Sequence, residues 1–397
     1  MGKTRFGKRR YRLFVLGIIA CCVVIYGCIT QYEATGVEGL NRILVVEGFI
    51  TDDITTIRLS KSIGLSERFI YDTIPVDQAT LHVACDDGTV YDVSLYAGKG
   101  TYLIETGHLN PDKKYRLHVF LDGEEYRSEF LKPLFTPDFN LSWVKKNEKA
   151  SISFQVSTLD STDQSAYYLW SYKEDWEFTA RLLVDSYCLN YVWVINDITS
   201  ANNYYYCWKK DSSRVFILGN ADGMIAHEIN NYEILSVFAS DERLSLLYHI
   251  AVKQNMIRKE AYTYYVNLQK NLERVGGIFS IIPSEVPGNL YCHTSPRLPV
   301  IGYVEVSTTV EQKRYIRAEE AYVPAINYDD CLMPPGGSPP PECSPHYMWK
   351  WAIFDWSSTT GDPRVFPLKY YYNITCMDCL AAGGTKDKPE WWPTDHL

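Results

Sequence analysis

The feature that most constrains the fold is a series of short apolar segments, each of strand length, between Arg42 and Leu134. They are separated by turn signals such as Asp87-Gly88 and Asp122-Gly123, dipeptides typical of tight β-hairpin turns. Seven candidate strands follow one another at the spacing of a β-sandwich. Their sequences are ILVVEGFI, TIRLS, ATLHVAC, TVYDVSL, GTYLIE, KYRLHVFL and EEYRSEFL. We therefore expect a β-sandwich at residues 42–135.

A turn motif in the same region indicates which type of β-sandwich to expect. The segment LNPDKKY, with Leu109, Pro111 and Tyr115, resembles the turn before a late strand of fibronectin-type sandwiches. In that turn the tyrosine hydroxyl bonds back to the backbone at a corner. The alternative is a proline turn followed by an ordinary strand tyrosine. We interpret the region as an immunoglobulin- or fibronectin-like sandwich.

Residues 136–310 predict a second, larger, mostly-β domain with one clear helix. Aromatic residues make up 14% of the chain and tyrosines number 31, which favours strands. Near 258–275, however, Ala261, Tyr265 and Leu268 recur at helical spacing. The glycine pair at 276–277 is expected to end this helix.

The N-terminus has the pattern of an export signal. Six basic residues among the first twelve precede an apolar run, 13–25, which is shorter than the ~20 residues that span a bilayer. The run ends in VVIYGC, which resembles the lipobox of bacterial lipoproteins. That resemblance implies cleavage before Cys28 and lipid on Cys28, with residues 1–27 as signal peptide and 28–41 as tether. Cleavage before Cys21 and an uncleaved signal anchor are the alternatives.

The net charge of the chain limits the classes of partner that we expect. Removing the six basic charges of the signal from the chain's net −9 leaves about −15. An acidic chain without a basic block argues against nucleic-acid binding. The lipid would then be the membrane attachment, since no apolar run outside the signal reaches membrane length.

Export permits disulfides. Eight cysteines remain after Cys28, an even number, as a disulfide set requires. We pair Cys188 with Cys207 across a loop between candidate strands. In the Cys- and Trp-rich region 311–397, Cys331 and Cys343 are expected to pair with Cys376 and Cys379, in an order that the sequence leaves open. Cys85 alternates with apolar residues and is interpreted as a buried core thiol, and the state of Cys292 stays open.

Two other interpretations of the C-x-x-C at Cys376 and Cys379, a redox motif and a zinc site, have less support from the sequence than disulfides. A redox motif belongs at a helix N-terminus beside a βαβ unit, which this sequence lacks. Zinc binding by the four tail cysteines conflicts with their C-x11-C and C-x2-C spacings, which match no two-knuckle site. We predict no metal and no cofactor.

Catalytic patterns are absent from the sequence: there is no G-x-S-x-G, H-E-x-x-H or phosphate loop. Glu174, Asp175 and Glu177 cluster beside Trp176, an arrangement that would suit a glycosidase. We interpret them instead as a solvated strand end. His82 and His118 lie inside strand patterns and are interpreted as structural, so no catalytic residue is predicted.

Ten tryptophans invite a binding interpretation, because exposed Trp and Tyr stack on sugars or anchor interfaces. Most are expected in the core. Trp349 and Trp351 share a predicted strand face and Trp391-Trp392 close the tail, so these four are the candidate binding aromatics.

Several segments in a fixed order resemble a known family. They are ILVVEGFIT after Cys28, YYLWSYKEDWE, CWKK, VKQNMIRKEAYTYYVNLQ, GGIFSIIPSEVPGNLY, VIGYVEVS and CMDCLAAGGTKDKPEWW. This set is similar to the Bacteroidetes lipoproteins grouped as domain of unknown function 4249, over nearly all of the mature chain.

The resemblance implies a non-enzymatic, lipid-anchored outer-membrane protein. It would be an accessory partner of a TonB-dependent receptor, or would capture a small ligand, glycan or peptide, in nutrient uptake. A structural or adhesive envelope protein is the alternative, and a glycan hydrolase a weaker one. Surface lipoproteins of these bacteria often carry acids after the lipidated cysteine. Here only Glu33 follows Cys28 closely, so the membrane side stays open.

Overall fold

The computed structural model describes most of the chain from Ile43 onward. The described residues are 43–62, 74–146, 150–160, 162, 164–181, 183, 186–189, 192–195, 203–224, 227–274, 288–321, 349–354, 368–389 and 391–393. The predicted signal region and Cys28, the predicted lipidation site, lie outside this part, as do Cys331 and Cys343.

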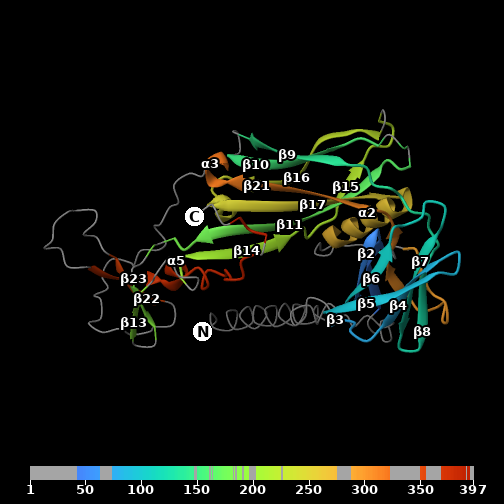
Figure 1. Cartoon of the computed structure of the whole chain (residues 1–397), viewed down its shortest axis with the longest axis horizontal. Helices are drawn as coiled ribbons and strands as arrows, with labels where there is room; N and C mark the ends of the chain where they lie inside the picture. The colour runs from blue at the N-terminus through green and yellow to red at the C-terminus, as the bar shows by residue number, and fades with distance from the viewer. Residues whose placement is uncertain are drawn as a thin grey trace, which may run out of the picture.

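The first body of the molecule, here the N-terminal unit, is a continuous curled sheet on the right of Figure 1. Its strand order is β18-β8-β7-β4-β5-β6-β2-β1-β19, with β3 beside β2 and β20 beside β1. The strands are β1 (Leu44–Ile50), β2 (Asp53–Lys61), β3 (Ile74–Pro75), β4 (Thr80–Cys85), β5 (Val90–Gly98), β6 (Thr101–Gly107), β7 (Tyr115–Leu121), β8 (Glu124–Ser128), β18 (Leu290–Cys292), β19 (Val300–Gly302) and β20 (Glu305–Val306).

Alternation of apolar and polar residues explains the curl. Val46 of β1, Ile57 of β2, Val83 of β4 and Leu117 of β7 are all buried in one core, although their strands lie in different parts of the sheet. Strand side chains point alternately to the two faces, so each strand offers one apolar face to this core. The predicted mostly-β, sandwich-like fold is confirmed.

The structure also contains the predicted hairpin turn and the predicted tyrosine corner. Asp122 and Gly123 both have positive φ, 54° and 83°, as a two-residue turn between β7 and β8 requires. At the corner, the backbone N–H of Asn110 donates to the Tyr115 hydroxyl at 2.9 Å. The predicted tyrosine corner is therefore present, and it fixes the chain entering β7.

The domain assignment of residues 290–306 needs a correction. The segment 290–306, assigned by sequence to the second domain, completes the sheet of the N-terminal unit. β18 pairs with β8, while β19 and β20 run parallel to β1. The physical reason is that edge strands leave backbone groups unpaired, and a distant segment can cover them. Such two- or three-residue strands carry no periodicity of their own.

The second unit is a sandwich of two sheets packed across a core. A three-stranded sheet, β16-β10-β9, covers one face of a five-stranded sheet, β14-β11-β17-β21 with β15 also on β11. Across the core Phe154 and Tyr248 have ring centroids 5.4 Å apart. The strands are β9 (Phe139–Lys146), β10 (Ser151–Thr158), β11 (Tyr167–Thr179), β14 (Tyr206–Ser212), β15 (Ile217–Asn220), β16 (Ile229–Phe238), β17 (Leu247–Ile257) and β21 (Thr309–Arg317), with a short helix η3 (Glu242–Leu244).

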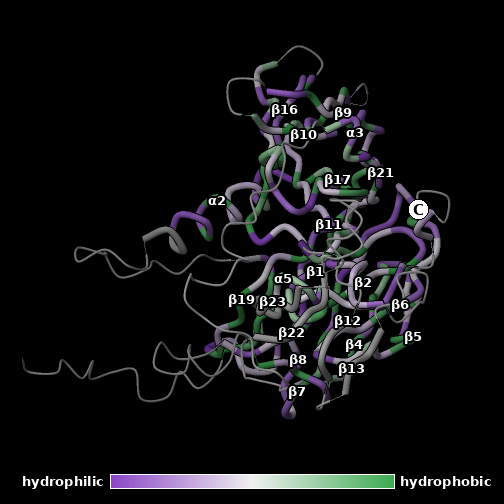
Figure 2. Tube along the Cα trace, turned by 90° about the vertical axis from the view of Figure 1, so that its left-hand side faces the viewer, coloured by the Kyte–Doolittle hydropathy of each residue, from purple (hydrophilic) through white to green (hydrophobic). Residues whose placement is uncertain are grey.

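The predicted helix is α2 (Lys259–Arg274), which follows β17 directly and lies at the junction of the two units in Figure 1. It buries Ala261, Tyr264 and Tyr265. Figure 2 shows apolar and polar residues intermixed along the strands of both units, as expected for sheets with one covered face. Within the described residues, no helix has the length and apolar character needed to cross a membrane.

The C-terminal region is divided among three places. The expected boundary at 310 falls inside β21, so residues 311–317 belong to the five-stranded sheet of the second unit. A separate small sheet, on the left of Figure 1, contains β13 (Val192–Ile195), β12 (Ser186–Leu189), β22 (Trp349–Phe354) and β23 (Leu368–Asn373). Two short helices, α3 (Ala318–Ala321) and α5 (Ile374–Met377), follow β21 and β23. The segment around Thr385 lies along β14, where Thr385 and Trp208 exchange two backbone hydrogen bonds.

Candidate functional site

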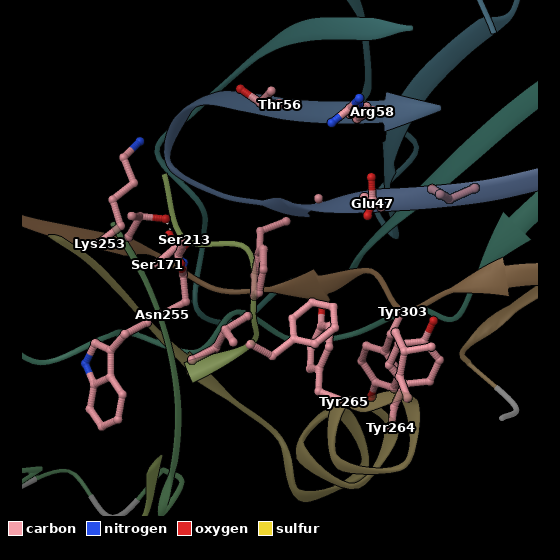
Figure 3. Close-up of a pocket in the computed structure, with 18 of the residues that line it drawn as sticks. Glu47, Thr56, Arg58, Ser171, Ser213, Lys253, Asn255, Tyr264, Tyr265 and Tyr303 are labelled. Carbon is pink, nitrogen blue, oxygen red and sulfur yellow. Dashed lines mark hydrogen bonds between the residues drawn. The ribbon is translucent and has the colours of Figure 1, made fainter. Parts of the chain in front are cut away.

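A cavity of about 760 Å³ lies between the N-terminal unit and the second unit. Its walls come from β1 and β2, from the five-stranded sheet, and from α2 with the neighbouring Tyr303. Figure 3 shows Glu47, Thr56 and Arg58 above the opening, Tyr264, Tyr265 and Tyr303 below it, and Lys253, Ser171, Ser213 and Asn255 at one side. Its volume is in the range of small-molecule sites, and such sites favour junctions between domains.

The upper wall is the outer face of the β1–β2 pair. Glu47 stands opposite Arg58, and Phe49 opposite Thr56, in the antiparallel register. The inner face of the same strands, with Val46 and Ile57, belongs to the core of the N-terminal unit. Strand alternation therefore turns Glu47, Thr56 and Arg58 toward the cavity while Val46 and Ile57 face the core.

The side wall is the face of the five-stranded sheet that the three-stranded sheet leaves open. Ser171 of β11 pairs with Lys253 of β17, and Lys253 pairs with Glu311 of β21, so the three side chains share one face. On the opposite face, Trp170 donates from its indole N–H to the side chain of Gln254 in the core, at 2.7 Å.

The lower wall is a row of aromatic rings, here called the aromatic row: Phe216, Tyr265, Tyr264 and Tyr303. Successive ring centroids lie 4.9, 5.3 and 5.8 Å apart. Burial raises the pKa of Tyr264 to about 12, and it raises the pKa values of Tyr265 and Tyr303 further. These phenols are therefore neutral at physiological pH, and the wall they form is uncharged.

Polar contacts fix the two units on either side of the cavity. The hydroxyls of Thr51 and Thr309 lie 3.2 Å apart across the seam. The side-chain amide of Asn255 donates to the Thr309 hydroxyl at 2.7 Å. Beside α2, the backbone N–H of Arg258 donates to the carboxylate of Glu305, a fully buried residue of the N-terminal unit's sheet. The cavity is thus bounded by elements that are bonded to each other, as a preformed site requires.

A second, smaller cavity of about 160 Å³ opens beside the first along the same sheet face. Its polar lining, here called the serine–lysine subsite, consists of Ser171, Ser212, Ser213, Lys173, Lys253 and Glu311. Ser171, Ser213 and Lys253 line both cavities.

The carboxylates beside Trp176 do not lie at a solvated strand end, so that interpretation is wrong. Glu174 and Glu177 are 2% and 0% exposed. They belong to the part of β11 that is paired with β14 on one side and with β17 on the other.

Each of these carboxylates has its own partners. Glu174 accepts hydrogen bonds from Arg243, at 3.1 and 3.2 Å, and from the Tyr248 hydroxyl at 2.5 Å. Glu177 accepts one from the indole N–H of Trp392 at 3.1 Å. Because residues three apart in a strand point to opposite faces, Glu174 and Glu177 do not face a common cleft, and the glycosidase arrangement is not formed by them.

The two histidines interpreted as structural lie on the N-terminal unit. His82 and His118 stand opposite each other on β4 and β7, with stacked rings 4.6 Å apart. His118 Nδ1 lies 2.8 Å from a carboxylate oxygen of Glu125. They lie outside the lining of both cavities.

The disulfide pairing expected from the sequence is corrected. Cys207 is bonded to Cys379, 172 residues away, and not to Cys188. Cys379 is therefore not paired with Cys331 or Cys343. Cys376 is also disulfide-bonded, and the side chain of Cys188 lies outside the described part. The reason for the error is that tertiary folding places Cys379 against the edge strand β14, which nearest-neighbour spacing cannot foresee. Cys85 is a buried free thiol, as predicted, and Cys292 is another.

The four candidate binding aromatics differ in exposure and surroundings. Trp392 is 2% exposed and packs with Glu177, so it belongs to the core. Trp391 is 47% exposed and its ring lies 4.2 Å from that of His249, which also contacts Tyr315 at 4.7 Å. It lies outside the lining of both cavities. The backbone of Trp349 and Trp351 is in β22, and their side chains lie outside the described part.

Among the described residues, no group of three or more His, Cys, Asp or Glu is arranged to hold a metal ion. The residues that line the cavities were missed by sequence reasoning. The signal that existed was the polar alternation of Ser171 with Lys173 on β11, which reads equally well as an ordinary solvated face. The contribution of β1 and β2 to the same cavity has no signature in either segment.

Comparison with known proteins gives one family. Residues 29–313 match the model described as "Domain of unknown function (DUF4249)", which is more than half of the chain. None of the curated proteins matches the chain. The matched range contains the N-terminal unit, α2 and most of the second unit, and it includes all residues that line the two cavities. The chain belongs to the DUF4249 family of domains of unknown function.

Proposed function

We propose that this protein is a non-enzymatic lipoprotein of the outer membrane, which captures a ligand and acts beside a TonB-dependent receptor in nutrient uptake. The observation that carries the ligand-capture part is the cavity of about 760 Å³ between the two units. Attachment through Cys28 is supported by the basic and apolar leader and by the lipobox-like VVIYGC. The assignment to Bacteroidetes lipoproteins rests on the resemblance of the ordered segments.

The chemistry of the lining supports binding rather than catalysis. Among the described residues of the larger cavity, one carboxylate is present, Glu47, and it stands opposite Arg58. Hydrolysis of a glycoside uses two carboxylates across the bond that is cleaved. The rest of the lining combines aromatic rings with hydroxyl, amide and cationic groups, which is the usual composition of a binding site.

The polar contacts between the two units support capture by a preformed site. The Thr51–Thr309 contact joins the units in the lining of the cavity, and the Arg258–Glu305 ion pair joins them at the start of α2. A site that is already formed loses less conformational entropy when the ligand binds.

Affinity purification from detergent-solubilised outer membranes tests the proposal. The tagged wild-type chain is expected in the outer-membrane fraction, with a TonB-dependent receptor among the co-purified proteins identified by mass spectrometry. The Cys28→Ala variant should lose the lipid, seen as a mass difference, and should leave the outer-membrane fraction. A wild-type chain that fractionates with soluble periplasmic proteins, or that brings down no receptor, would contradict the proposal.

A further inference from the structure

We propose that the ligand is an amphiphilic acid, with one anionic head in the serine–lysine subsite and a flat apolar body on the aromatic row. This inference rests on the proposed ligand-capture function and names the class of ligand. It starts from the continuity of the two cavities, which share Ser171, Ser213 and Lys253 as lining. A single molecule can therefore occupy both.

The size difference assigns the two ends of the ligand. The smaller cavity, of about 160 Å³, suits a carboxylate, sulfate or phosphate group, while the larger one, of about 760 Å³, suits the body of a drug-sized molecule. In the larger cavity the aromatic row offers ring faces and edges in succession from Phe216 to Tyr303. Flat apolar groups stack favourably on such rings.

The charged side chains of the two linings indicate where the anionic head of the ligand would bind. In the larger cavity Arg58 faces Glu47 across the strand pair, and Arg214 lies 3.2 Å from Asp211. Arg214 is thereby paired, and Arg58 has the Glu47 carboxylate opposite it in the strand register. In the smaller cavity the lining carries Lys173 and Lys253 against the single carboxylate of Glu311.

The Glu311 carboxylate is shared between two lysines. Glu311 lies 3.1 Å from Lys313, outside the lining, and 3.7 Å from Lys253. Lys173 forms no ion pair with the described residues. The subsite therefore has an excess of positive charge within a chain of net charge −9, and this local reversal is what an anion would recognise.

Hydroxyl groups complete the subsite. The Ser213 hydroxyl oxygen accepts from the backbone N–H of Tyr172 at 3.2 Å, which leaves its proton for another acceptor. Among the described residues, the hydroxyls of Ser171 and Ser212 form no hydrogen bond. Two ammonium groups and three hydroxyls are donors, and hydrogen bonds in which one partner is charged are the stronger kind.

A matched pair of probes tests the inference. Indole-3-acetate and indole-3-acetamide have the same flat ring and nearly the same shape, but only the first carries a charge. Their dissociation constants are measured by isothermal titration calorimetry on the full chain in detergent micelles, with empty micelles as the blank. We expect the wild type to bind the acetate about tenfold or more tightly than the amide, the difference of a charge-assisted hydrogen bond.

Three variants locate the two ends. Lys253→Gln is expected to bring the acetate-to-amide ratio close to one, with the amide's dissociation constant unchanged. Phe216→Leu should weaken both probes by a similar factor, because it shortens the aromatic row. Lys145→Gln removes the same charge from an exposed position on β9, outside both linings, and should leave the wild-type ratio intact.

Equal affinities of the two probes for the wild type would overturn the inference and leave ligand capture standing. A preference for the acetate that persists in Lys253→Gln would overturn the placement of the head, and with it the inference. Binding of neither probe would overturn it as well. The proposed function is judged separately, by the receptor and the membrane fraction in the purification described above.

Discussion

Arg258 binds the carboxylate of Glu305 at the seam between the two units. The backbone N–H of Arg258 donates to Glu305 at 3.0 Å, and its guanidinium forms an ion pair with the same carboxylate. Glu305 is fully buried, and burial raises the pKa of this carboxyl while Arg258 opposes the rise. The pair connects β20 of the N-terminal unit with the start of α2, the helix that carries the lower wall of the cavity.

Removal of the arginine side chain should cost stability. Arg258→Met leaves the Glu305 carboxylate buried without its cation, and we expect a loss of about 3–5 kcal/mol in the free energy of unfolding, measured in urea. Lys259→Met is the matched control, because the Lys259 side chain is 70% exposed. The double variant Arg258→Met/Glu305→Met should recover part of the loss. Equal stability of Arg258→Met and wild type would show that the pair does not hold the seam.

The Cys207–Cys379 disulfide should hold the C-terminal segment on β14. It closes a loop with a sequence separation of 172 residues, so the chain-entropy effect of removing it is large. The double variant Cys207→Ala/Cys379→Ala is expected to lose about 2–5 kcal/mol in the free energy of unfolding. Non-reducing peptide mapping by mass spectrometry should recover the linked peptides from wild type. Linkage of Cys207 to Cys188 instead would contradict the pairing.

The tyrosine corner should make a measurable but modest contribution. Tyr115→Phe removes the hydroxyl that accepts from Asn110, in a buried side chain of otherwise unchanged shape. We expect a loss of about 1 kcal/mol in urea unfolding. Tyr291→Phe is the control, since this side chain is 44% exposed and its hydroxyl forms no hydrogen bond with the described residues. If both variants lose the same amount, the corner bond adds nothing.

The stability of the N-terminal unit should fall in mild acid. Burial lowers the pKa of both His82 and His118 below the usual 6.5. For His82 the carboxylates of Asp92 and Glu125 oppose this, and Arg116 adds to it; for His118 Glu125 opposes, while Arg116 and His82 add to it. The unfolded chain therefore takes up protons at these imidazoles at a higher pH than the folded protein does. Stability is complete above about pH 6.5 and is lost as the pH falls toward the lowered folded values.

Urea unfolding between about pH 8 and pH 5 measures this dependence. The variant His82→Gln/His118→Gln should show a flatter dependence than the wild type, whereas His108→Gln, at a side chain that is 91% exposed, should not. The Glu125 carboxyl affects stability in a separate, lower pH range. Arg127, its main partner, lowers the pKa of this carboxyl to about 2, so its contribution is lost only as the pH falls below its usual value of 4.5. A wild-type stability that is constant down to about pH 5 would refute the histidine effect.

Local patterns predicted much of the fold and little of the site. The alternation of ATLHVAC predicted both β4 and the buried thiol of Cys85. The spacing of Ala261, Tyr265 and Leu268 predicted α2. The same kind of reasoning placed Glu174 and Glu177 at a solvated end, because the sequence around a charged residue does not reveal what covers it.

By itself, the sequence determined the strands, the hairpin at Asp122-Gly123 and the corner at Tyr115, because each depends on residues that are close in the chain. Only the tertiary structure decided that 290–306 joins the N-terminal sheet, that Cys207 pairs with Cys379, and that Lys253 meets β1 and β2 around one cavity. The physical reason is that local periodicity sets which face of a strand is apolar. Which distant edge or face it then meets depends on packing and hydrogen bonding over the whole chain.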